Sequence, residues 1–271
     1  MAKALPSNNV SALNNQQLLS FLKSGLYFCL AHWLRLFVYS VLTLFLVAFL
    51  YAFTVWAVGS YKILSDDPTV WQSSIDTLNQ EDNQNGLLHN NTLFVGSSSI
   101  RLFENLEALF PGHNVLKKGF GGAKINDLSY YKENIIFQYK PKLIVMYIGI
   151  NDILYRNYQE VNELSSDLFT LTDEITYRFP DSHLVLLALR DLNNKHSQDI
   201  TIYNQHLKTY ASSHANVHYI DANQTLLLAN NKPNPDFLMW DGLHLNKKGY
   251  ETWGIQLNKQ LNQLEIVKPG E

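Results

Sequence analysis

The sequence is poor in cysteine and in clustered charge. Cys29 is the one cysteine among 271 residues, which excludes an intrachain disulfide. Lys and Arg together number 21 against 24 Asp and Glu, so the formal net charge is −3, and no long basic run occurs. Proteins that bind nucleic-acid phosphates carry clustered Lys and Arg. We therefore expect no nucleic-acid partner.

One stretch of the chain lacks charge altogether. Residues 36–61, LFVYSVLTLFLVAFLYAFTVWAVGSY, contain no charged side chain. A helix of about 20 apolar residues crosses the hydrocarbon core of a bilayer. Tyr39, Trp56 and Tyr61 near the two ends are suited to the membrane interface. These features predict a transmembrane anchor over residues 36–61, in preference to a buried core helix.

Basic residues are more frequent before this stretch than after it. Lys23 and Arg35 precede it, whereas Lys62 follows alone and is succeeded by acidic residues. The positive-inside rule then predicts a cytoplasmic or interfacial segment at 1–35. We expect a single-pass protein of a bacterial inner membrane, with its C-terminal part on the periplasmic side. Cleavage after small residues at 57–59 is the alternative, but signal peptides have a shorter apolar core of about 7–15 residues.

A polar spacer follows the apolar stretch. Asp67-Pro68 is typical of a helix start, with a capping carboxylate and a proline at the first helical position. The polar sequence EDNQNG ends that pattern. Residues 62–90 are therefore predicted to form a helical spacer.

From residue 91 onward, short apolar runs alternate with longer helical patterns. Near-continuously apolar strands that alternate with helices indicate a parallel sheet buried on both faces. The predicted strands are 92–95, 114–117, 142–148, 183–189 and 217–220, and the predicted helices lie near 100–110, 125–138, 160–178, 198–213 and 246–264. The fold class is thus α/β, a three-layer α/β/α domain with a five-stranded parallel, flavodoxin-like sheet. It is predicted to span residues 91–265, followed by a tail at 266–271.

Polar groups follow several of these strands. The first strand ends in Gly-Ser-Ser-Ser at 96–99, and the second is followed by a glycine-rich loop at 119–122. The third leads to Asn151, and Asp241 and His244 precede the last helix. Ligands of open α/β sheets bind beyond the carboxyl ends of the strands. We therefore expect these groups to meet at one edge of the sheet.

Together these residue types suit acyl transfer. A serine hydroxyl becomes a nucleophile when a base, usually histidine, takes its proton, and a carboxylate such as Asp241 orients the histidine. Backbone amides at Ser98 and Gly122 and the side-chain amide of Asn151 are candidate donors to an oxyanion. Spacing alone leaves open which of the serines at 97–99 attacks. It also leaves open whether they merely cap the following helix.

Four short blocks, GSSSI, GFGG, GIND and DGLH, together resemble the SGNH (GDSL-type) hydrolase superfamily, whose blocks contribute Ser, Gly, Asn and His in that order. The resemblance covers about residues 91–265. It implies that Ser98 is the nucleophile, His244 the general base and Asp241 the residue that orients it. It also implies an oxyanion hole of the Ser98 amide, Gly122 and Asn151.

The first block departs from the usual pattern of that superfamily. An aspartate commonly precedes the nucleophile, and Ser97 stands there in this chain. The change removes a negative charge beside the site but leaves the attacking group in place, so we expect activity to survive. The G-x-S-x-G signature of ordinary α/β-hydrolases is absent, because Ile100 replaces the second glycine.

The sequence therefore predicts a membrane-anchored serine esterase that hydrolyses carboxylic esters. Short acyl groups such as acetyl, on glycans or small molecules, are expected because no lid-like insertion interrupts the strands. No cofactor is expected, and no metal, because Asp241 and His244 would supply two ligands without an obvious third. Two alternatives stay open: acyl transfer to an envelope glycan, and a catalytically dead binding domain tethered to the membrane. The oligomeric state is not predicted.

Overall fold

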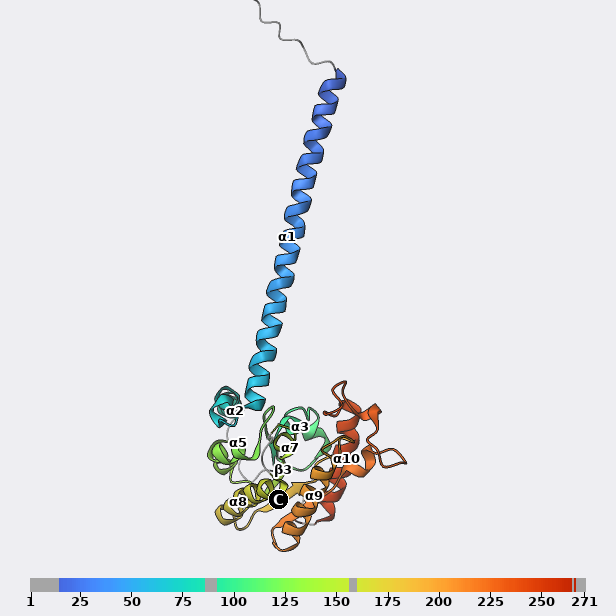
Figure 1. Ribbon diagram of the computed structural model, residues 1–271. Coiled ribbons are helices and arrows are strands. Elements are labelled where there is room, and N and C mark those ends of the chain that lie inside the picture. Colours follow the sequence, from blue (N-terminus) through green and yellow to red (C-terminus); the bar gives the residue numbers. More distant parts are fainter. Residues whose placement is uncertain (1–14, 86–91, 156–159, 265, 267–271) are drawn as a thin grey trace, which may run out of the picture. The chain divides into compact units, whose positions relative to one another are not determined.

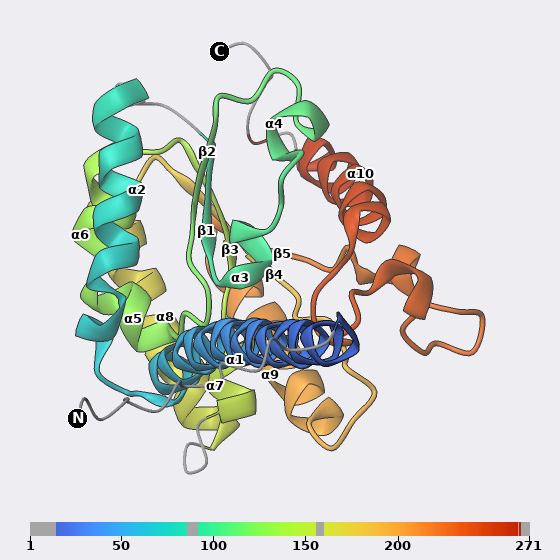
Figure 2. The same ribbon diagram turned by 90° about the horizontal axis from the view of Figure 1, so that it is seen from above.

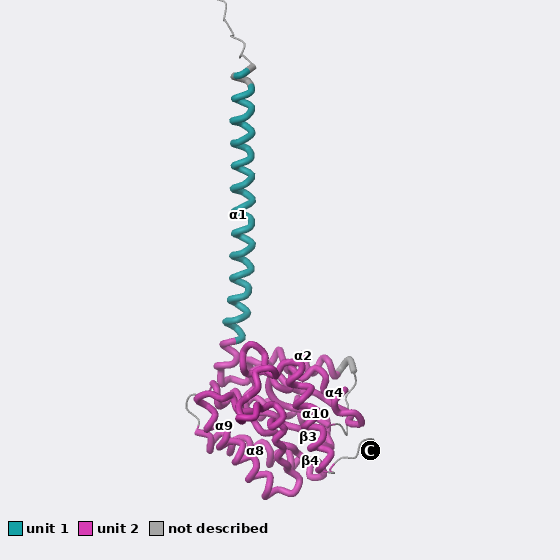
Figure 3. The backbone as a smooth tube through the Cα atoms, turned by 90° about the vertical axis from the view of Figure 1, so that its right-hand side faces the viewer, with its two compact units in different colours: residues 1–59 teal, residues 60–271 magenta. Residues whose placement is uncertain are grey.

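A computed structural model describes residues 15–85, 92–155, 160–264 and 266 of the chain. It divides into two compact units, residues 1–59 and 60–271 (Figure 3). Parts of the predicted N-terminal segment 1–35, of the spacer 62–90 and of the tail 266–271 lie outside the described residues.

The first unit consists of most of helix α1 (Asn15–Leu64), which Figure 1 shows as one continuous helix. Residues 19–64 of this helix are long and apolar enough to cross a membrane, judged by length and composition. The helix is longer than the uncharged run at 36–61, because lysine and arginine are good helix formers and do not interrupt it. Its last residues, from Ser60 on, belong to the second unit.

The second unit is built around a five-stranded parallel sheet, in the order β2-β1-β3-β4-β5. The strands are β1 (Thr92–Gly96), β2 (Val115–Gly119), β3 (Leu143–Tyr147), β4 (His183–Leu187) and β5 (Val217–Ile220). All residues of β1 and β3 are buried, as expected for strands covered on both faces. The strand order is that of flavodoxin-like sheets, which confirms the predicted fold class.

Helices cover both faces of the sheet. Figure 2 shows α2, α5, α6 and α8 on one side of the strands and α4 and α10 on the other. The helices of this unit are η1 (Pro68–Trp71), α2 (Gln72–Asn85), α3 (Ser98–Arg101), α4 (Leu106–Leu109), α5 (Ile125–Tyr130), α6 (Lys132–Ile135), η2 (Phe137–Tyr139), α7 (Ile150–Tyr155), α8 (Val161–Arg178), α9 (Ser197–Ser212), η3 (Asn223–Leu226), η4 (Pro235–Phe237) and α10 (Lys247–Gln263). The three-layer arrangement predicted from the alternating pattern is confirmed.

Two of the predicted helices are broken into shorter pieces. The pattern near 100–110 forms α3 and α4, and the pattern near 125–138 forms α5, α6 and η2. After α3, the Lys117 ammonium donates hydrogen bonds to the carbonyl oxygens of Arg101 and Phe103, each at 3.3 Å. These carbonyls are thereby satisfied outside a helix, so the chain can leave the helical path at this point.

The segment after α1 packs into the second unit. Asp67 caps η1 by accepting a hydrogen bond from the Thr69 amide at 2.9 Å, as the Asp-Pro pair predicts. Further on, Asp82 of α2 forms a buried ion pair with Lys118 of β2 and accepts a hydrogen bond from the Tyr139 hydroxyl. Breaking one partner of such a buried pair leaves an uncompensated charge. Helix α2 is therefore firmly held against the edge strand β2.

Candidate active site

The last residue of β1 is Gly96, which lies close to the backbone of the neighbouring strand β3. Gly96 has a φ of +150°, and a Cβ added there would lie 2.0 Å from the Tyr147 carbonyl oxygen of β3. No larger residue fits at this point. The chain therefore turns directly from the strand into Ser97, the N-cap of α3, and into Ser98 and Ser99, its first two residues.

The three serines have different surroundings. The Ser98 hydroxyl lies 2.8 Å from Nε2 of His244, which comes from the other end of the domain sequence. Ser99 forms a side-chain hydrogen bond with Tyr147. Ser97 is fully buried, and its hydroxyl has no hydrogen-bond partner in the described part of the chain. Ser97 occupies the N-cap position of α3 without a capping side-chain bond, so capping does not account for these residues.

Asp241 fixes the His244 ring. Its Oδ2 lies 2.7 Å from Nδ1 of His244, and its Oδ1 accepts the backbone amides of Leu243 and His244, both at 2.9 Å. A proton on Nδ1 satisfies the carboxylate, which leaves Nε2 as an acceptor facing the Ser98 hydroxyl. This is the tautomer that a general base requires.

Two opposing effects act on the pKa of Asp241. Partial burial raises it, because a charged carboxylate loses solvation. Hydrogen bonds from the His244 side chain and from the backbone amides of His244 and Leu243 lower it, and together they outweigh burial. The pKa of Asp241 is therefore lowered from its usual value, which keeps the carboxylate ionised next to the imidazole.

The loops that carry the predicted oxyanion donors contact each other. Asn151, in the first turn of α7, is buried, and its Nδ2 donates to the Ala123 carbonyl oxygen at 2.9 Å. The next residue, Asp152, accepts the Ile125 amide at 3.3 Å with both carboxylate oxygens. Gly122 lies in this same loop, with a φ of +76° that favours glycine. The bond to Ala123 uses one amide hydrogen of Asn151 and leaves the second for another acceptor.

The glycine-rich loop is also tied to the nucleophile strand. The Phe120 amide donates to the Gly96 carbonyl oxygen at 3.2 Å, directly before the serines. Ser98, His244 and Asp241 thus come together as predicted, and the loops of Gly122 and Asn151 adjoin each other. The oxyanion roles of Gly122, Asn151 and the Ser98 amide stay predictions.

Arg190 supports the histidine loop in a way that the sequence did not reveal. It follows β4, is 5% exposed, and its guanidinium donates to the Leu243 carbonyl oxygen, between Asp241 and His244. Its backbone amide donates to the Tyr147 hydroxyl at 3.4 Å. Its position shortly after the end of β4 places Arg190 near this edge of the sheet. Its backbone acceptor, 53 positions later, leaves no sequence signal.

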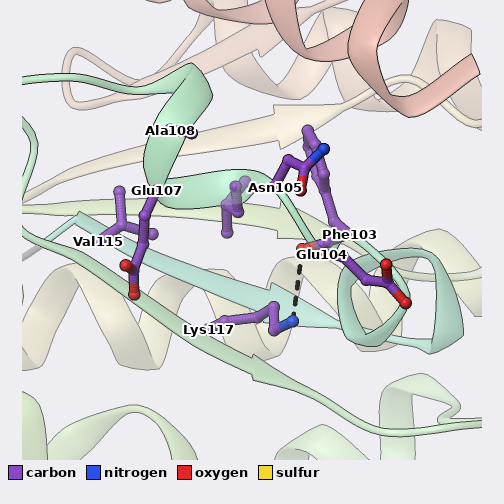
Figure 4. A pocket seen from close by; sticks show the side chains of 8 residues that line it. Phe103, Glu104, Asn105, Glu107, Ala108, Val115 and Lys117 are labelled. Atoms are coloured by element: carbon purple, nitrogen blue, oxygen red, sulfur yellow. Dashed lines mark hydrogen bonds between the residues drawn. The ribbon is translucent and has the colours of Figure 1, made fainter. Parts of the chain in front are cut away.

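A pocket in the described part of the chain lies away from these groups. It has a volume of about 320 Å³ and is shown in Figure 4; its lining residues are Phe103, Glu104, Asn105, Leu106, Glu107, Ala108, Val115 and Lys117. The dashed line there is the hydrogen bond from Lys117 to the Phe103 carbonyl. None of the predicted site residues lines it, so it is separate from the candidate active site. Among the described residues, no group of three or more His, Cys, Asp or Glu side chains is arranged to hold a metal ion.

Residues 95–252 match the model of the GDSL-like lipase/acylhydrolase family, which is more than half of the chain. The chain belongs to this family. As a GDSL-family member it is an ester-hydrolysing serine hydrolase, as the four blocks predicted. A comparison with curated proteins finds no match.

Several solved structures share the fold of this GDSL-family chain. A Streptococcus pneumonia protein named for platelet activating factor is 22% identical, with a TM-score of 0.62. The matched region covers 70% of this chain and 92% of that protein's chain. A GDSL-like lipase from Bacteroides thetaiotaomicron is 15% identical, with a TM-score of 0.58 and coverages of 70% and 99%. An acetylxylan esterase from Geobacillus stearothermophilus is 18% identical, with a TM-score of 0.54 and coverages of 67% and 98%. At these identities the likeness shows the fold alone.

Proposed function

We propose that this protein is a membrane-anchored esterase in which Ser98, His244 and Asp241 form the catalytic triad. The observation that carries the proposal is the continuous chain of contacts from Asp241 Oδ2 to His244 Nδ1 at 2.7 Å and from His244 Nε2 to Ser98 Oγ at 2.8 Å. Both distances are within the range in which protons are transferred between catalytic groups.

In the first half of the reaction, Ser98 Oγ attacks the ester carbonyl carbon while His244 Nε2 takes the hydroxyl proton. The carbonyl oxygen becomes an oxyanion, which accepts hydrogen bonds from the Ser98 and Gly122 amides and the Asn151 side chain. The tetrahedral intermediate then collapses. The bond to the alcohol oxygen breaks, His244 returns the proton to that oxygen, and the acyl group stays on Ser98.

In the second half, water replaces the alcohol. His244 Nε2 takes a proton from the water as its oxygen attacks the acyl carbon, and the second tetrahedral intermediate collapses to release the carboxylic acid. The proton returns to Ser98 Oγ through His244. Asp241 remains ionised throughout and stabilises the imidazolium that forms in each half-reaction.

Short acyl groups such as acetyl, on glycans or small molecules, are the proposed substrates. The presence of an acetylxylan esterase among proteins of the same fold supports this choice. No separate lid domain occurs between the strands in the described ranges. Hydrolysis of p-nitrophenyl esters from acetyl to dodecanoyl tests the proposal. Activity is expected to fall with acyl length, and a preference for long chains would contradict it.

The anchor is proposed from the first unit. Helix α1 carries an uncharged stretch of sufficient length, and the basic residues before it favour a cytoplasmic N-terminus. The catalytic unit would then face the periplasm. Protease treatment of spheroplasts tests this orientation: the catalytic unit is expected to be digested from outside, and full protection would overturn it.

The nucleophile is tested with full-length protein in detergent and p-nitrophenyl acetate as substrate. Ser98→Ala is expected to lower kcat by about 10⁴–10⁶-fold, as the loss of a serine nucleophile does elsewhere. Ser97→Ala is the matched control. It removes a neighbouring hydroxyl without a hydrogen-bond partner among the described residues, so activity is expected to stay near that of the wild type. Loss in Ser97→Ala with turnover in Ser98→Ala would refute the assignment.

The role of Asp241 is tested by Asp241→Asn. The amide cannot stabilise an imidazolium and favours the wrong histidine tautomer, so kcat is expected to fall by about 10⁴-fold. Measurement of kcat and KM separately is informative, because substrate binding is not expected to depend on this carboxylate. A variant with unchanged kcat would remove Asp241 from the triad.

A further inference from the structure

The last turn of α1 and the segment that follows it pack directly against the loop of Gly122. A Cβ added at Gly122 would lie 2.9 Å from Ile63 Cγ1 and 3.0 Å from two ring carbons of Trp71. At these distances one or the other must shift to admit even a methyl group. Ile63 and Trp71 are therefore in contact with the backbone of the loop that carries a proposed oxyanion donor.

Trp71 is held firmly in this position. It ends η1, whose start is capped by Asp67, and its side chain is buried at 7% exposure. Its ring lies 5.7 Å from that of Phe120, in the same glycine-rich loop, and the Lys62 ammonium lies 5.6 Å from the ring centroid. The indole is thus packed between residues before it in the chain and the loop that it supports.

A buried lysine holds the same two segments together from the other side. Lys124 is 1% exposed, and its ammonium donates to the Ser65 carbonyl oxygen at 2.8 Å and to Asp66 Oδ1 at 3.1 Å. Asn126 adds a hydrogen bond from its Nδ2 to the Asp66 carbonyl oxygen at 3.0 Å. A buried ammonium is stable only with such partners. The contacts therefore fix the loop on both sides of Gly122.

We infer that residues 62–73 are a positioning element of the active site, with Trp71 as the positioning residue that sets the direction of the Gly122 amide. The inference rests on the proposed oxyanion role of Gly122. A backbone amide stabilises an oxyanion only when its direction is fixed before the reaction. Ile63 and Trp71 pack against this backbone at the point where Gly122 has a φ of +76°.

This element is continuous with the candidate anchor. The uncharged run ends at Tyr61, and residues from Ser60 onward already belong to the catalytic unit. The proposed membrane span ends at Tyr61, and Ile63, two residues later, already contacts the Gly122 loop. In this proposal, the element that positions the Gly122 loop also joins the catalytic unit to the candidate anchor.

The inference is tested by kinetics of full-length protein in detergent, with p-nitrophenyl acetate as substrate. Trp71→Ala is expected to lower kcat by about 10–100-fold with little change in KM. Loss of a whole oxyanion donor lowers kcat by about 10²–10³-fold, and this variant would misdirect the donor without removing it. Trp71→Phe, which keeps a ring at this position, should restore most of the loss. Ile63→Ala tests the same contact independently and is expected to lower kcat less.

The decisive comparison repeats Trp71→Ala in a Gly122→Ala background. Gly122→Ala alone should be strongly impaired, because its methyl collides with the indole and its φ is unfavourable. Removal of the indole should then cost no further activity or restore some. An equal fold-loss of kcat in both backgrounds, or a loss seen only in KM, would overturn the positioning role.

Phe110→Ala is the matched control for lost packing. Phe110 is a fully buried aromatic near the start of β1, where His113 contacts both it and Thr92. The variant Phe110→Ala should lower the unfolding temperature without the loss of kcat that is expected for Trp71→Ala. Activity in Ser98→Ala would refute the proposed triad itself. An inactive Ser98→Ala together with independent effects of Trp71 and Gly122 would refute only this inference.

Discussion

Helix α1 and the catalytic sheet use the same residue types with opposite exposure. In α1, Trp33 is 72% exposed and Phe45 is 71% exposed. In β1 and β3, Phe94, Ile144 and Val145 are completely buried. Apolar side chains therefore occur in both units, and their exposure is what separates α1 from the sheet.

The difference lies in what covers the apolar surface. The strands are covered by helices of their own unit, and their backbone groups are paired with neighbouring strands. Helix α1 satisfies its backbone internally and presents apolar side chains around its whole circumference, which is the condition for stability in lipid. A bilayer is the environment that would cover this surface, since leaving it in water is unfavourable.

Arginine substitutions test this comparison most strongly. The double change Leu46→Arg with Leu50→Arg adds two charges in the middle of the span, each costing about 2.5–3.5 kcal/mol on insertion. The protein is expected to leave the membrane fraction on carbonate extraction. Tyr177→Arg with Ile255→Arg, at exposed apolar positions of the catalytic unit, is the control and should remain anchored. Equal behaviour of the two pairs would contradict a membrane role for α1.

A matched pair of phenylalanines tests the comparison from the other side. Phe94→Ala removes a fully buried ring from β1 and is expected to lower the free energy of unfolding of the catalytic unit by about 3–5 kcal/mol. Phe45→Ala, in α1, should leave that free energy unchanged. Both are measured by denaturant unfolding of the detergent-solubilised protein, followed through loss of esterase activity. A comparable loss in Phe45→Ala would mean that α1 stabilises the catalytic unit.

The smallest expected effect concerns pH and a histidine pair at the far end of the sheet. His183 Nδ1 and His218 Nε2 lie 3.0 Å apart, and burial lowers the pKa of both, with His183 lowering that of His218 further. Below about pH 6.5 the unfolded chain binds more protons than the folded one, so stability falls as pH decreases from there. His183→Gln should show a smaller drop in unfolding temperature between pH 7.5 and 5 than the wild type. An identical drop would show that the pair does not contribute.

The strands of this fold were predictable because β1, β3 and β4 are short, nearly uninterrupted apolar runs between polar segments, whereas β2 begins with two apolar residues and continues with Lys117 and Lys118. The broken helices at 98–109 and 125–139 were not, because their breaks depend on tertiary contacts such as the Lys117 hydrogen bonds to the Arg101 and Phe103 carbonyls. Local periodicity carries no information about such partners.

The candidate site shows the same division. Chemistry and spacing pointed to a serine among 97–99 together with Asp241 and His244, and the resemblance of four ordered blocks to the SGNH superfamily singled out Ser98. The contacts through which other residues hold these three side chains and their loops could not be identified from the sequence. The carbonyl that Arg190 binds and the contact of Trp71 with Gly122 join segments about 50 residues apart, and a packed indole leaves the same sequence signal whether or not it supports a site.

The most direct test is to locate the covalent adduct that the full-length protein forms with a fluorophosphonate. Such a reagent reacts with a serine only where a base activates the hydroxyl and donors receive the new oxyanion. Mass spectrometry of the digested protein is expected to place the phosphonyl group on Ser98, and His244→Ala should abolish the adduct. A modified Ser97 or Ser99, or adduct formation that persists without the histidine, would contradict the proposed active site.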